Sequence, residues 1–319
     1  MGDGETDVGC DNSHAGVTVN PDDLARPEFV PDPSASREEM EALQREIAKD
    51  ARFEDDHELS PEAVAIDSPF EIGSGLPSAT QRTLVSDPAD EAGPIVVGID
   101  QAFTYEGDGS TVDGDESSGD DGGSGTDDRS GEAISAAVAI RDGRVIEYAH
   151  ATTPLSIPYI PGLLAFREGG PILAALDALS VDPDLLVLDG SGRIHYREAG
   201  IATHVGVVHD VPSIGVAKSL LCGVPDESVD GRPAGWRTAI RADGSMSTAS
   251  TDEPIVGYAY QSRQYPNSRR VNPLYVSPGH RVSASTAVDL VEALCAGYKL
   301  PEPTRLADAF ADAVKRGSP

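Results

Sequence analysis

The sequence predicts an α/β fold in which helices flank a mixed sheet. Two continuously apolar runs of strand length, at 95–99 and 185–188, indicate strands that are covered on both faces. Each run ends on an acidic residue, Asp100 in the first and Asp189 in the second. Helical patterns alternate with the later strand patterns, and this alternation is typical of α/β folds.

The first elements follow a segment without periodicity, residues 1–35, which we expect to be a flexible acidic tail. A helix is predicted at 36–52, because Ser36 can cap its start and Glu39 stands three residues later, as in a capping box. One face of this helix carries the apolar side chains of Met40, Leu43, Ile47 and Ala51. The polar residues 53–90 are expected to connect over the surface.

A hairpin is predicted after the first strand. The runs 133–140 and 144–152 are joined by Asp142-Gly143, a pair that favours a tight hairpin turn. Between the first strand and the hairpin, residues 105–131 are rich in Gly, Ser and acids, and they lack the apolar side chains that would offset the entropy of ordering. We expect a disordered acidic insertion there, since its aspartates do not have the regular spacing of a calcium loop.

The second half of the chain alternates between helix and strand patterns. A helix over 171–180 is expected to begin at Pro171, because proline suits a first helical turn. Later patterns predict a helix at 200–209, a strand at 213–217, late strands at 254–262 and 272–277, and a helix at 283–296. Between the late strands, Arg263, Arg269 and Arg270 form the densest basic cluster of the chain. Residues 301–319 are expected to be a C-terminal tail with a marginal helix.

The composition is strongly acidic, with 54 Asp and Glu residues against 24 Lys and Arg residues and a formal net charge of −30. Such a chain is at first sight a poor partner for nucleic acid, because phosphate binding requires Lys and Arg. The acids are spread over every segment, however, and this favours a halophilic protein over an acidic protein of another origin. In molar salt the Debye length is only ~3 Å. A nuclease working there would depend on metal, stacking and shape.

The cysteines, Cys10, Cys222 and Cys295, are odd in number and lack metal-binding spacing, which indicates a reducing interior without disulfides. No apolar run reaches the ~20 residues of a membrane span, and the polar, acidic start is unlike a signal peptide. We therefore expect a cytoplasmic, monomeric protein that has no membrane partner.

The least ordinary segment runs from Pro158 to Gly170. Its prolines stiffen the backbone on both sides of Tyr159, which favours a wedge over a core residue. Glu168 stands just before the predicted start of the next helix, a place where sites are often built. The alternative is a stiff surface turn in which Glu168 pairs with Arg167.

Three carboxylates, Asp100, Glu168 and Asp189, are thus predicted at the ends of elements. In open α/β sheets ligands bind beyond the carboxyl ends of the strands. Carboxylates with water suit Mg²⁺ or Mn²⁺. The alternative is that the two aspartates only form turns or cap helices.

Four motifs resemble those of the endonuclease V family, the repair nucleases for deaminated adenine, and they lie in the family's order. The motifs are Tyr159–Glu168 (YIPGLLAFRE), Asp189-Gly190, Gly215–Ser219 (GVAKS) and Ser277–Arg281 (SPGHR). The resemblance covers about residues 40–103 and 132–297.

This resemblance implies a ribonuclease H-like mixed sheet with strand order 3-2-1-4-5, flanked by helices, in one endonuclease V-like domain over 36–300. It places the strands of Asp100 and Asp189 side by side. It also implies a DNA repair enzyme, a deoxyinosine 3′-endonuclease. Such an enzyme hydrolyses the second phosphodiester bond 3′ to deoxyinosine and leaves a 3′-hydroxyl and a 5′-phosphate.

The resemblance also implies roles for single residues. Asp100, Glu168 and Asp189 would hold Mg²⁺, for which Mn²⁺ can substitute, and would be catalytic together with His280. Tyr159 would fill the gap left by the altered base. The remaining DNA-binding residues would be Pro158, Ile160, Pro161 and Lys218, and the base pocket would contain Gly162, Gly190 and Gly192. The alternatives are an ordinary exposed lysine for Lys218 and a locally bonded, helix-start histidine for His280.

One departure from the family pattern concerns Ser191, which stands where the family commonly has histidine, and the following segment 193–198 also differs. This leaves the pocket and the strand preference open. Two other functions also remain open: an endonuclease for inosine-containing RNA, and a binder of damaged nucleic acid that does not cut. A related ribonuclease H-like domain of excision repair is disfavoured by the Tyr159 and Gly215–Ser219 motifs.

Overall fold

The structure is a computed structural model that describes residues 20–73, 75–79, 93–105, 131–155, 157–158, 160–247 and 254–317. The expected acidic insertion at 105–131 lies almost entirely outside the described residues, as do residues 1–19 of the expected tail. No helix in the described ranges is long and apolar enough to cross a membrane.

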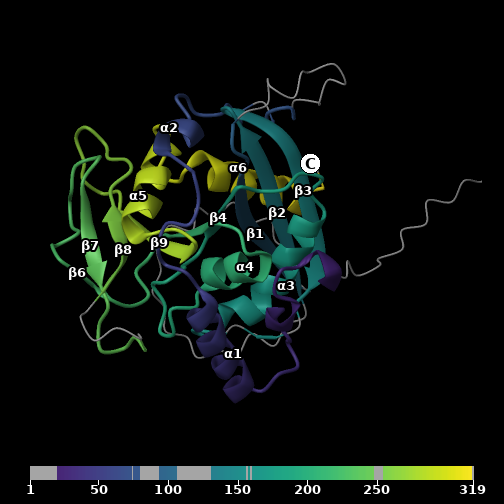
Figure 1. Ribbon diagram of the computed structural model, residues 1–319. Helices are drawn as coiled ribbons and strands as arrows, with labels where there is room; N and C mark the ends of the chain where they lie inside the picture. Colours follow the sequence, from purple (N-terminus) through teal and green to yellow (C-terminus); the bar gives the residue numbers. More distant parts are fainter. Residues whose placement is uncertain are drawn as a thin grey trace, which may run out of the picture.

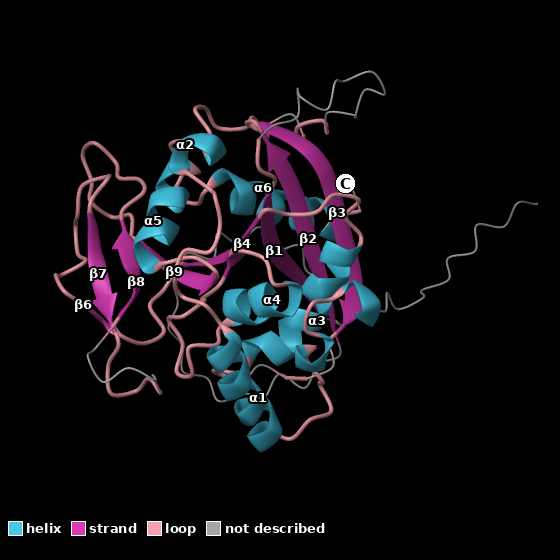
Figure 2. Ribbon diagram, in the orientation of Figure 1, coloured by secondary structure: helices cyan, strands magenta, loops and turns pink. Residues whose placement is uncertain are grey.

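A mixed sheet of nine strands forms the centre of the described part, in the order β3-β2-β1-β4-β5-β9-β8-β7-β6 (Figures 1 and 2). The strands are β1 Val96–Tyr105, β2 Gly131–Arg141, β3 Arg144–Pro154, β4 Leu185–Asp189, β5 Ser213–Ala217, β6 Val224–Pro225, β7 Arg237–Arg241, β8 Ile255–Tyr260 and β9 Leu274–His280. The β1 strand is antiparallel to β2 and parallel to β4, and β4 is parallel to β5. The first five strands therefore confirm the predicted ribonuclease H-like order.

Helices cover both faces of this sheet (Figure 2). The helices are α1 Arg37–Asp50, α2 Pro61–Val64, α3 Leu164–Asp177, α4 Ile201–His209, α5 Ala284–Ala293 and α6 Glu302–Lys315, with 3₁₀ turns η1 Pro21–Asp23 and η2 Pro27–Phe29. Side chains alternate between the faces of a strand. Val96 and Leu185 accordingly pack with α5 and α6, while Val97 and Leu186 pack with α3 and α4.

The locally coded elements form as predicted. Ser36 caps α1 in a capping box with Glu39. The β2–β3 hairpin turns at Asp142 and Gly143, which have φ angles of 52° and 66°, as a type I′ turn requires. The expected short helix at 200–209, the strand at 213–217 and the helix capped by Ser283 are all present.

The start of α3 differs from the prediction. This helix begins at Leu164, so Pro171 lies inside it and Glu168 belongs to the helix instead of preceding it. Proline in a helix interior costs ~3 kcal/mol or more, since it cannot donate to the carbonyl one turn earlier. Burial of the face that carries Phe166, Ile172 and Leu173 offsets that cost.

Both predicted tails are partly wrong. From Asn20 onward the chain packs onto α4: Leu24 and Phe29 are buried, and the Phe29 carbonyl oxygen lies 2.7 Å from His204 Nε2. At the other end, α6 spans 14 residues instead of a marginal helix. Its Leu306 and Phe310 join the core beside β1 and β2, because an amphipathic face gains stability from tertiary packing. The division into domains otherwise stays a prediction.

Candidate active site

Asp100 and Asp189 occupy adjacent register positions on β1 and β4. The last paired residues of these parallel strands are Ile99 and Leu188, and each aspartate directly follows one of them. Neighbouring strands lie about 4.8 Å apart. Asp100 closes the apolar run, and β1 continues past it along β2 to Tyr105. The predicted adjacency of the two acids is present.

The Asp100 carboxyl is strongly perturbed. Its side chain is buried, and burial, followed by the negative charge of Asp189, raises its pKa well above the usual range. Its Oδ1 accepts from the Gln101 backbone N–H at 2.7 Å, whereas its Oδ2 is buried without a hydrogen-bond partner. Buried polar atoms without partners are rare in native proteins and often indicate a missing ion or water.

Glu168 reaches the same region from α3. The Gln101 side-chain amide donates to the Glu168 carbonyl oxygen at 3.3 Å, which fixes this turn of α3 next to β1. Burial raises the pKa of the Glu168 carboxyl to about 7, with Arg167 opposing and Asp189 assisting the shift. The Arg167 guanidinium does not pair with Glu168. It donates to the Tyr105 hydroxyl at 3.0 Å and lies 5.4 Å from the Phe103 ring centroid.

A fourth carboxylate, Asp308 on α6, was missed by the sequence analysis. It lies close enough to Asp100 for its negative charge to act on that carboxyl, and its own pKa is raised mainly by burial. Asp308 lies in no recognised motif. The available signal was the apolar spacing of Leu306, Phe310 and Ala313, which indicates a packed helix.

Lys218 follows β5 and provides a positive charge next to these acids. Its ammonium Nζ donates to Asp189 Oδ2 at 2.7 Å. Burial acts to lower the pKa of Lys218, but the charges of Asp189 and Asp100 raise it overall. Lys218 is thus bound to the acids instead of standing alone as an ordinary surface lysine.

The residues present fit a hard divalent cation. All candidate ligands are carboxylate oxygens, and the Asp100 Oδ2 atom lacks a partner. Within the described ranges no three such side chains are already grouped as a metal site. Mg²⁺ needs no such cage, because it is usually bound by one or two carboxylates, waters and substrate phosphates. Asp100 and Asp189 therefore suffice as protein ligands, with Glu168 and Asp308 next to them.

The proline-flanked motif is fixed from behind by a polar network. Gly162 adopts a φ of 78°, and its carbonyl oxygen accepts from Gln44 Nε2 at 3.0 Å. His195 Nε2 lies 3.2 Å from the same oxygen. Ile160 packs with the buried Phe166 cluster. Pro158 and Pro161 lie within the described residues, and their role in binding DNA stays a prediction. Tyr159 lies outside the described residues.

The glycines of the expected base pocket are closely packed by the protein itself. A Cβ at Gly190 would lie 2.5 Å from Ile201, and one at Gly192 would lie 2.3 Å from the Pro278 carbonyl oxygen. A Cβ at Gly162 would approach the Tyr196 ring at 3.2 Å. Close packing accounts for Gly190 and Gly192. Their role in a base pocket stays a prediction.

His280 is not brought to the carboxylates. It pairs with Ser213 at the start of β5, whereas Asp189 pairs with Val216 near the end of that strand. The reason is that Pro278 and Gly279 continue β9 antiparallel to β5, which carries His280 away from the site. The prediction that His280 acts beside the metal is corrected accordingly.

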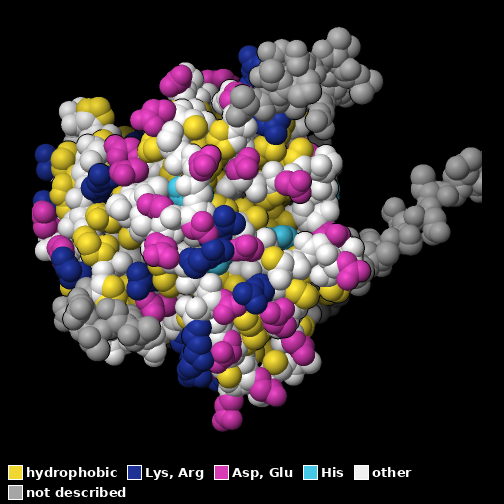
Figure 3. All heavy atoms as spheres, viewed as in Figure 1, with side chains coloured by type: hydrophobic (Ala, Val, Ile, Leu, Met, Phe, Trp, Pro, Cys, Tyr) yellow, Lys and Arg dark blue, Asp and Glu magenta, His cyan; other side chains and the backbone are white. Residues whose placement is uncertain are grey.

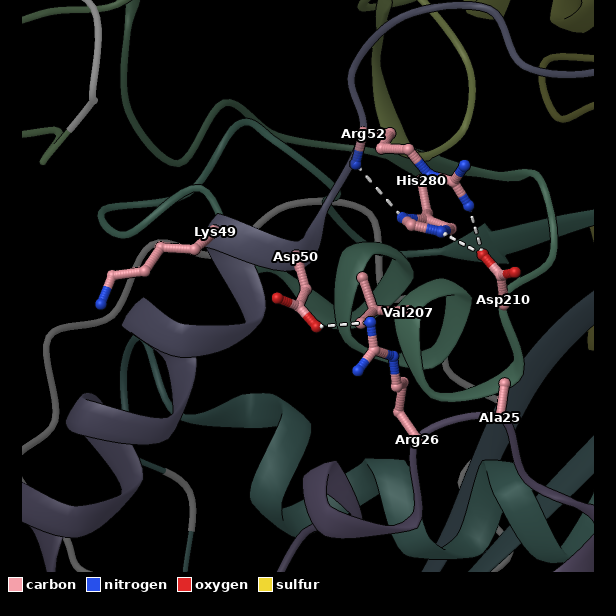
Figure 4. Close-up of a pocket in the computed structure, with 8 residues that line it drawn as sticks. All are labelled: Ala25, Arg26, Lys49, Asp50, Arg52, Val207, Asp210 and His280. Carbon is pink, nitrogen blue, oxygen red and sulfur yellow. Dashed lines mark hydrogen bonds and ion pairs between the residues drawn. The ribbon is translucent and has the colours of Figure 1, made fainter.

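The surroundings of His280 form a separate surface pocket (Figure 4). His280 Nε2 lies 2.9 Å from Asp210 Oδ1, and its Nδ1 accepts from the Arg52 backbone N–H at 3.3 Å. Burial lowers the pKa of His280 although Asp210 acts to raise it. Two arginines of the pocket are paired with acids: Arg52 with Asp210 at 2.6 Å and Arg26 with Asp50 at 3.1 Å. These contacts agree with the alternative of a locally bonded histidine.

Comparison with known proteins shows which family this chain resembles. A family model described as Endonuclease V matches residues 117–309. A curated protein named Endonuclease V from Halobacterium salinarum is 54% identical over 291 residues, which cover 90% of this chain and 98% of that protein. Its counterpart from Natronomonas pharaonis is 51% identical over 293 residues, covering 92% and 97%. Both relatives come from halophilic archaea, which supports the halophilic interpretation of the composition.

Solved structures confirm the fold. The crystal structure of an Endonuclease V from Streptomyces avermitilis has 30% identity and a TM-score of 0.58, covering 89% of this chain and 96% of that chain. An Endonuclease V from Ciona intestinalis, in complex with DNA containing an inosine followed by a ribo-adenosine, has 21% identity and a TM-score of 0.55, covering 88% and 97%. At that identity the second likeness concerns the fold alone.

Proposed function

This chain belongs to the endonuclease V family of nucleases, and on that premise we propose that it cuts DNA near deoxyinosine during repair of deaminated adenine. The bond cut would be the second phosphodiester 3′ to the lesion. The observation that carries this proposal is the unpartnered Asp100 Oδ2 beside Asp189, with Lys218 bound to Asp189 and with Glu168 and Asp308 near enough for the charge of Asp189 to act on them. The complex of the Ciona relative with inosine-containing DNA supports the choice of lesion.

Asp100 and Asp189 would hold Mg²⁺, or Mn²⁺ in its place, with Glu168 and Asp308 binding directly or through water. The bound cation would lower the pKa of a water and neutralise charge on the scissile phosphate. Lys218 sits where its ammonium can bind a phosphate oxygen as well as Asp189.

The hydrolysis itself forms one bond and breaks another. The water oxygen bonds to phosphorus while the P–O3′ bond breaks, and a proton goes to the departing O3′, which leaves a 3′-hydroxyl and a 5′-phosphate. Glu168, whose pKa is raised to about 7, can accept or donate that proton near neutral pH. Tyr159 would enter the gap left by the altered base, since inserted side chains stabilise a flipped nucleotide.

The test is a nicking assay in high KCl with Mg²⁺ or Mn²⁺, on end-labelled DNA that carries one deoxyinosine. We expect a single metal-dependent cut 3′ to the lesion. This cut should be abolished in Asp189→Ala and kept in Asp182→Ala, a matched control whose aspartate is exposed. Tight binding of the lesion without a cut under either metal would refute the catalytic proposal and leave a lesion-binding protein.

Inosine-containing RNA is the second candidate substrate, because the DNA in the Ciona complex carries a ribo-adenosine directly after the inosine. A matched RNA is therefore included in the same assay. Faster cutting of the RNA than of the DNA would make the chain an endoribonuclease on the same site.

A further inference from the structure

An exposed aromatic and basic surface lies between β8, β9 and the end of α5, and we call it the arginine–tyrosine platform. Its members are Arg263, Tyr265 and Tyr298, and the exposed Arg270 belongs to the same loop, residues 261–273. The two tyrosines are 51% and 43% exposed, the largest aromatic exposures among the described residues. The Arg263 guanidinium lies 5.3 Å from the Tyr265 ring centroid and 5.6 Å from that of Tyr298, and the Arg305 guanidinium lies 4.2 Å from the Tyr298 centroid.

The charge of this platform is unusual for so acidic a chain. Acids outnumber Lys and Arg by 54 to 24, and nearby arginines have acidic partners: Arg232 pairs with Glu227 at 3.3 Å and Arg305 with Glu302 at 2.5 Å. Within the described ranges, Arg263 and Arg270 have no carboxylate within 4.0 Å. Their positive charges therefore remain available to an external anion.

The loop that carries the platform, residues 261–273, is fixed by hydrogen bonds. Gln261 is buried, and its amide donates to the carbonyl oxygens of Arg263 at 2.7 Å and Val271 at 2.9 Å, which ties the two ends of the loop together. Gln264 donates to the Arg232 carbonyl oxygen at 3.0 Å. Such fixation lowers the entropy that a ligand must overcome on binding.

The platform adjoins the candidate active site. Tyr298 is followed by Lys299, whose carbonyl oxygen accepts from the Ser262 hydroxyl at 2.5 Å. The Lys299 ammonium lies close enough to the candidate site that the charges of Lys218 and Asp189 act on it. Burial and the positive charge of Lys218 lower the pKa of Lys299, while Asp189 acts to raise it. Tyr298 is therefore joined in sequence to a lysine on which the charges of the candidate site act.

We propose that the arginine–tyrosine platform binds unpaired nucleotides of the strand that is cut, with bases stacked on Tyr265 and Tyr298 and phosphates near Arg263 and Arg270. Exposed aromatic rings with neighbouring arginines are the means by which proteins bind single strands without sequence preference. Stacking also suits high salt, where phosphate contacts contribute less. The proposal rests on the proposed function, because it concerns the same substrate strand.

The test compares two double variants of the full chain, Tyr265→Leu/Tyr298→Leu and Tyr265→Phe/Tyr298→Phe. Both keep an apolar side chain at each position, but only the second keeps the rings. Affinity is measured by fluorescence anisotropy with EDTA, on deoxyinosine oligonucleotides whose flank is either unpaired or duplex. We expect the leucine variant to bind the unpaired flank at least about 5-fold more weakly than the wild type does. The same variant should bind the duplex flank like the wild type. The phenylalanine variant should match the wild type on both flanks.

A charge variant gives an independent readout. Arg270→Gln should reduce the salt slope of binding to the unpaired flank by about 0.7. Arg144→Gln, an exposed arginine on the other edge of the sheet, is the control and should leave the slope unchanged. Equal thermal midpoints of all variants establish that the fold is intact.

The platform proposal would be overturned if the leucine variant bound the unpaired flank as tightly as the wild type does. It would also be overturned if the variant lost the same affinity for the duplex flank as for the unpaired flank. Failure of the wild type to nick any deoxyinosine substrate would refute the proposed function instead. In that case the affinity comparison on unpaired strands still decides whether the platform binds nucleic acid.

Discussion

Glu168 couples the protonation of the site to the stability of the fold. Its pKa is raised to about 7 by burial, whereas the unfolded carboxyl titrates near about 4.3. A raised folded-state pKa means that the native protein holds its proton longer than the unfolded chain. For a carboxyl group, stability is therefore lost as pH rises between these two values.

We predict that the metal-free protein, measured with EDTA in constant high KCl, loses up to about 3 kcal/mol of unfolding free energy between pH 5 and pH 8 through Glu168. Thermal or denaturant unfolding at several pH values measures this loss. Glu168→Gln should flatten the profile, because glutamine does not titrate. A profile in the glutamine variant as steep as in the wild type would assign the pH dependence to other groups.

Asp308 is predicted to tune the site through the action of its charge on Asp100. We expect Asp308→Ala to lower the nicking rate about 10- to 100-fold and to raise the Mg²⁺ concentration needed for half-maximal rate, as losses of groups adjoining metal ligands do. Asp312→Ala, one turn further along α6 and paired with Arg316 at 3.6 Å, is the matched control. An unchanged Mg²⁺ titration in Asp308→Ala would remove this residue from the site.

At the scale of residues, the sequence predicted a site residue well where a charged side chain stands within a recognisable motif. Asp100, Asp189 and Lys218 could be predicted because each follows an apolar strand pattern, and the structure brings them together. Asp308 could not be predicted in this way, since its place depends on how α6 crosses β1. His280 was misplaced for a similar reason: the direction of β9 relative to β5 is a tertiary property that its motif does not encode.

At the scale of elements, the packing of α6 on β1 brings the Asp308 carboxyl near the Asp100 carboxyl. Gly98 faces α6, and a Cβ at this position would lie 2.1 Å from the Pro303 backbone. We predict that Gly98→Ala displaces α6, destabilises the protein by about 1 to 3 kcal/mol as overpacking does, and lowers the nicking rate because Asp308 moves with the helix.

Gly170→Ala is the control for this prediction. Gly170 lies inside α3, with no atom within 4 Å of an added Cβ, so alanine there should stabilise the protein by about 0.5 to 1 kcal/mol. Chemical denaturation of both variants measures the two opposite changes. A wild-type midpoint in Gly98→Ala would show that α6 adapts without strain.

Local signals account for which elements the sequence predicts well. The capping box of α1 and the Asp142-Gly143 turn act within a few residues, so they can be read from the chain directly. The start of α3 and the burial of α6 depend on partners far away in sequence. Pro171 indicates a helix start by local rules, yet the core contacts of Phe166 and Ile172 extend the helix through it.

At the scale of the whole molecule, the net charge of −30 opposes folding through self-repulsion unless salt screens it. Figure 3 shows Asp and Glu side chains scattered over the face in view, with Lys and Arg gathered in smaller groups. The Debye length is about 3 Å at 1 M salt and about 10 Å at 0.1 M. Repulsion between surface acids is therefore short-ranged only in concentrated salt.

We predict that the thermal midpoint falls steadily as KCl is lowered from molar to about 0.1 M, and that isosmolar sucrose does not restore it, since sucrose screens no charge. Nucleic-acid binding has the opposite salt dependence, because counterion release weakens phosphate contacts as salt rises. The nicking rate should therefore pass through a maximum at high KCl, where the gain in folded protein balances the loss of phosphate contacts. Calorimetry and nicking assays on the same samples separate the two effects. A midpoint independent of KCl would mean that charge repulsion does not limit this fold, and the rate would then fall with salt throughout.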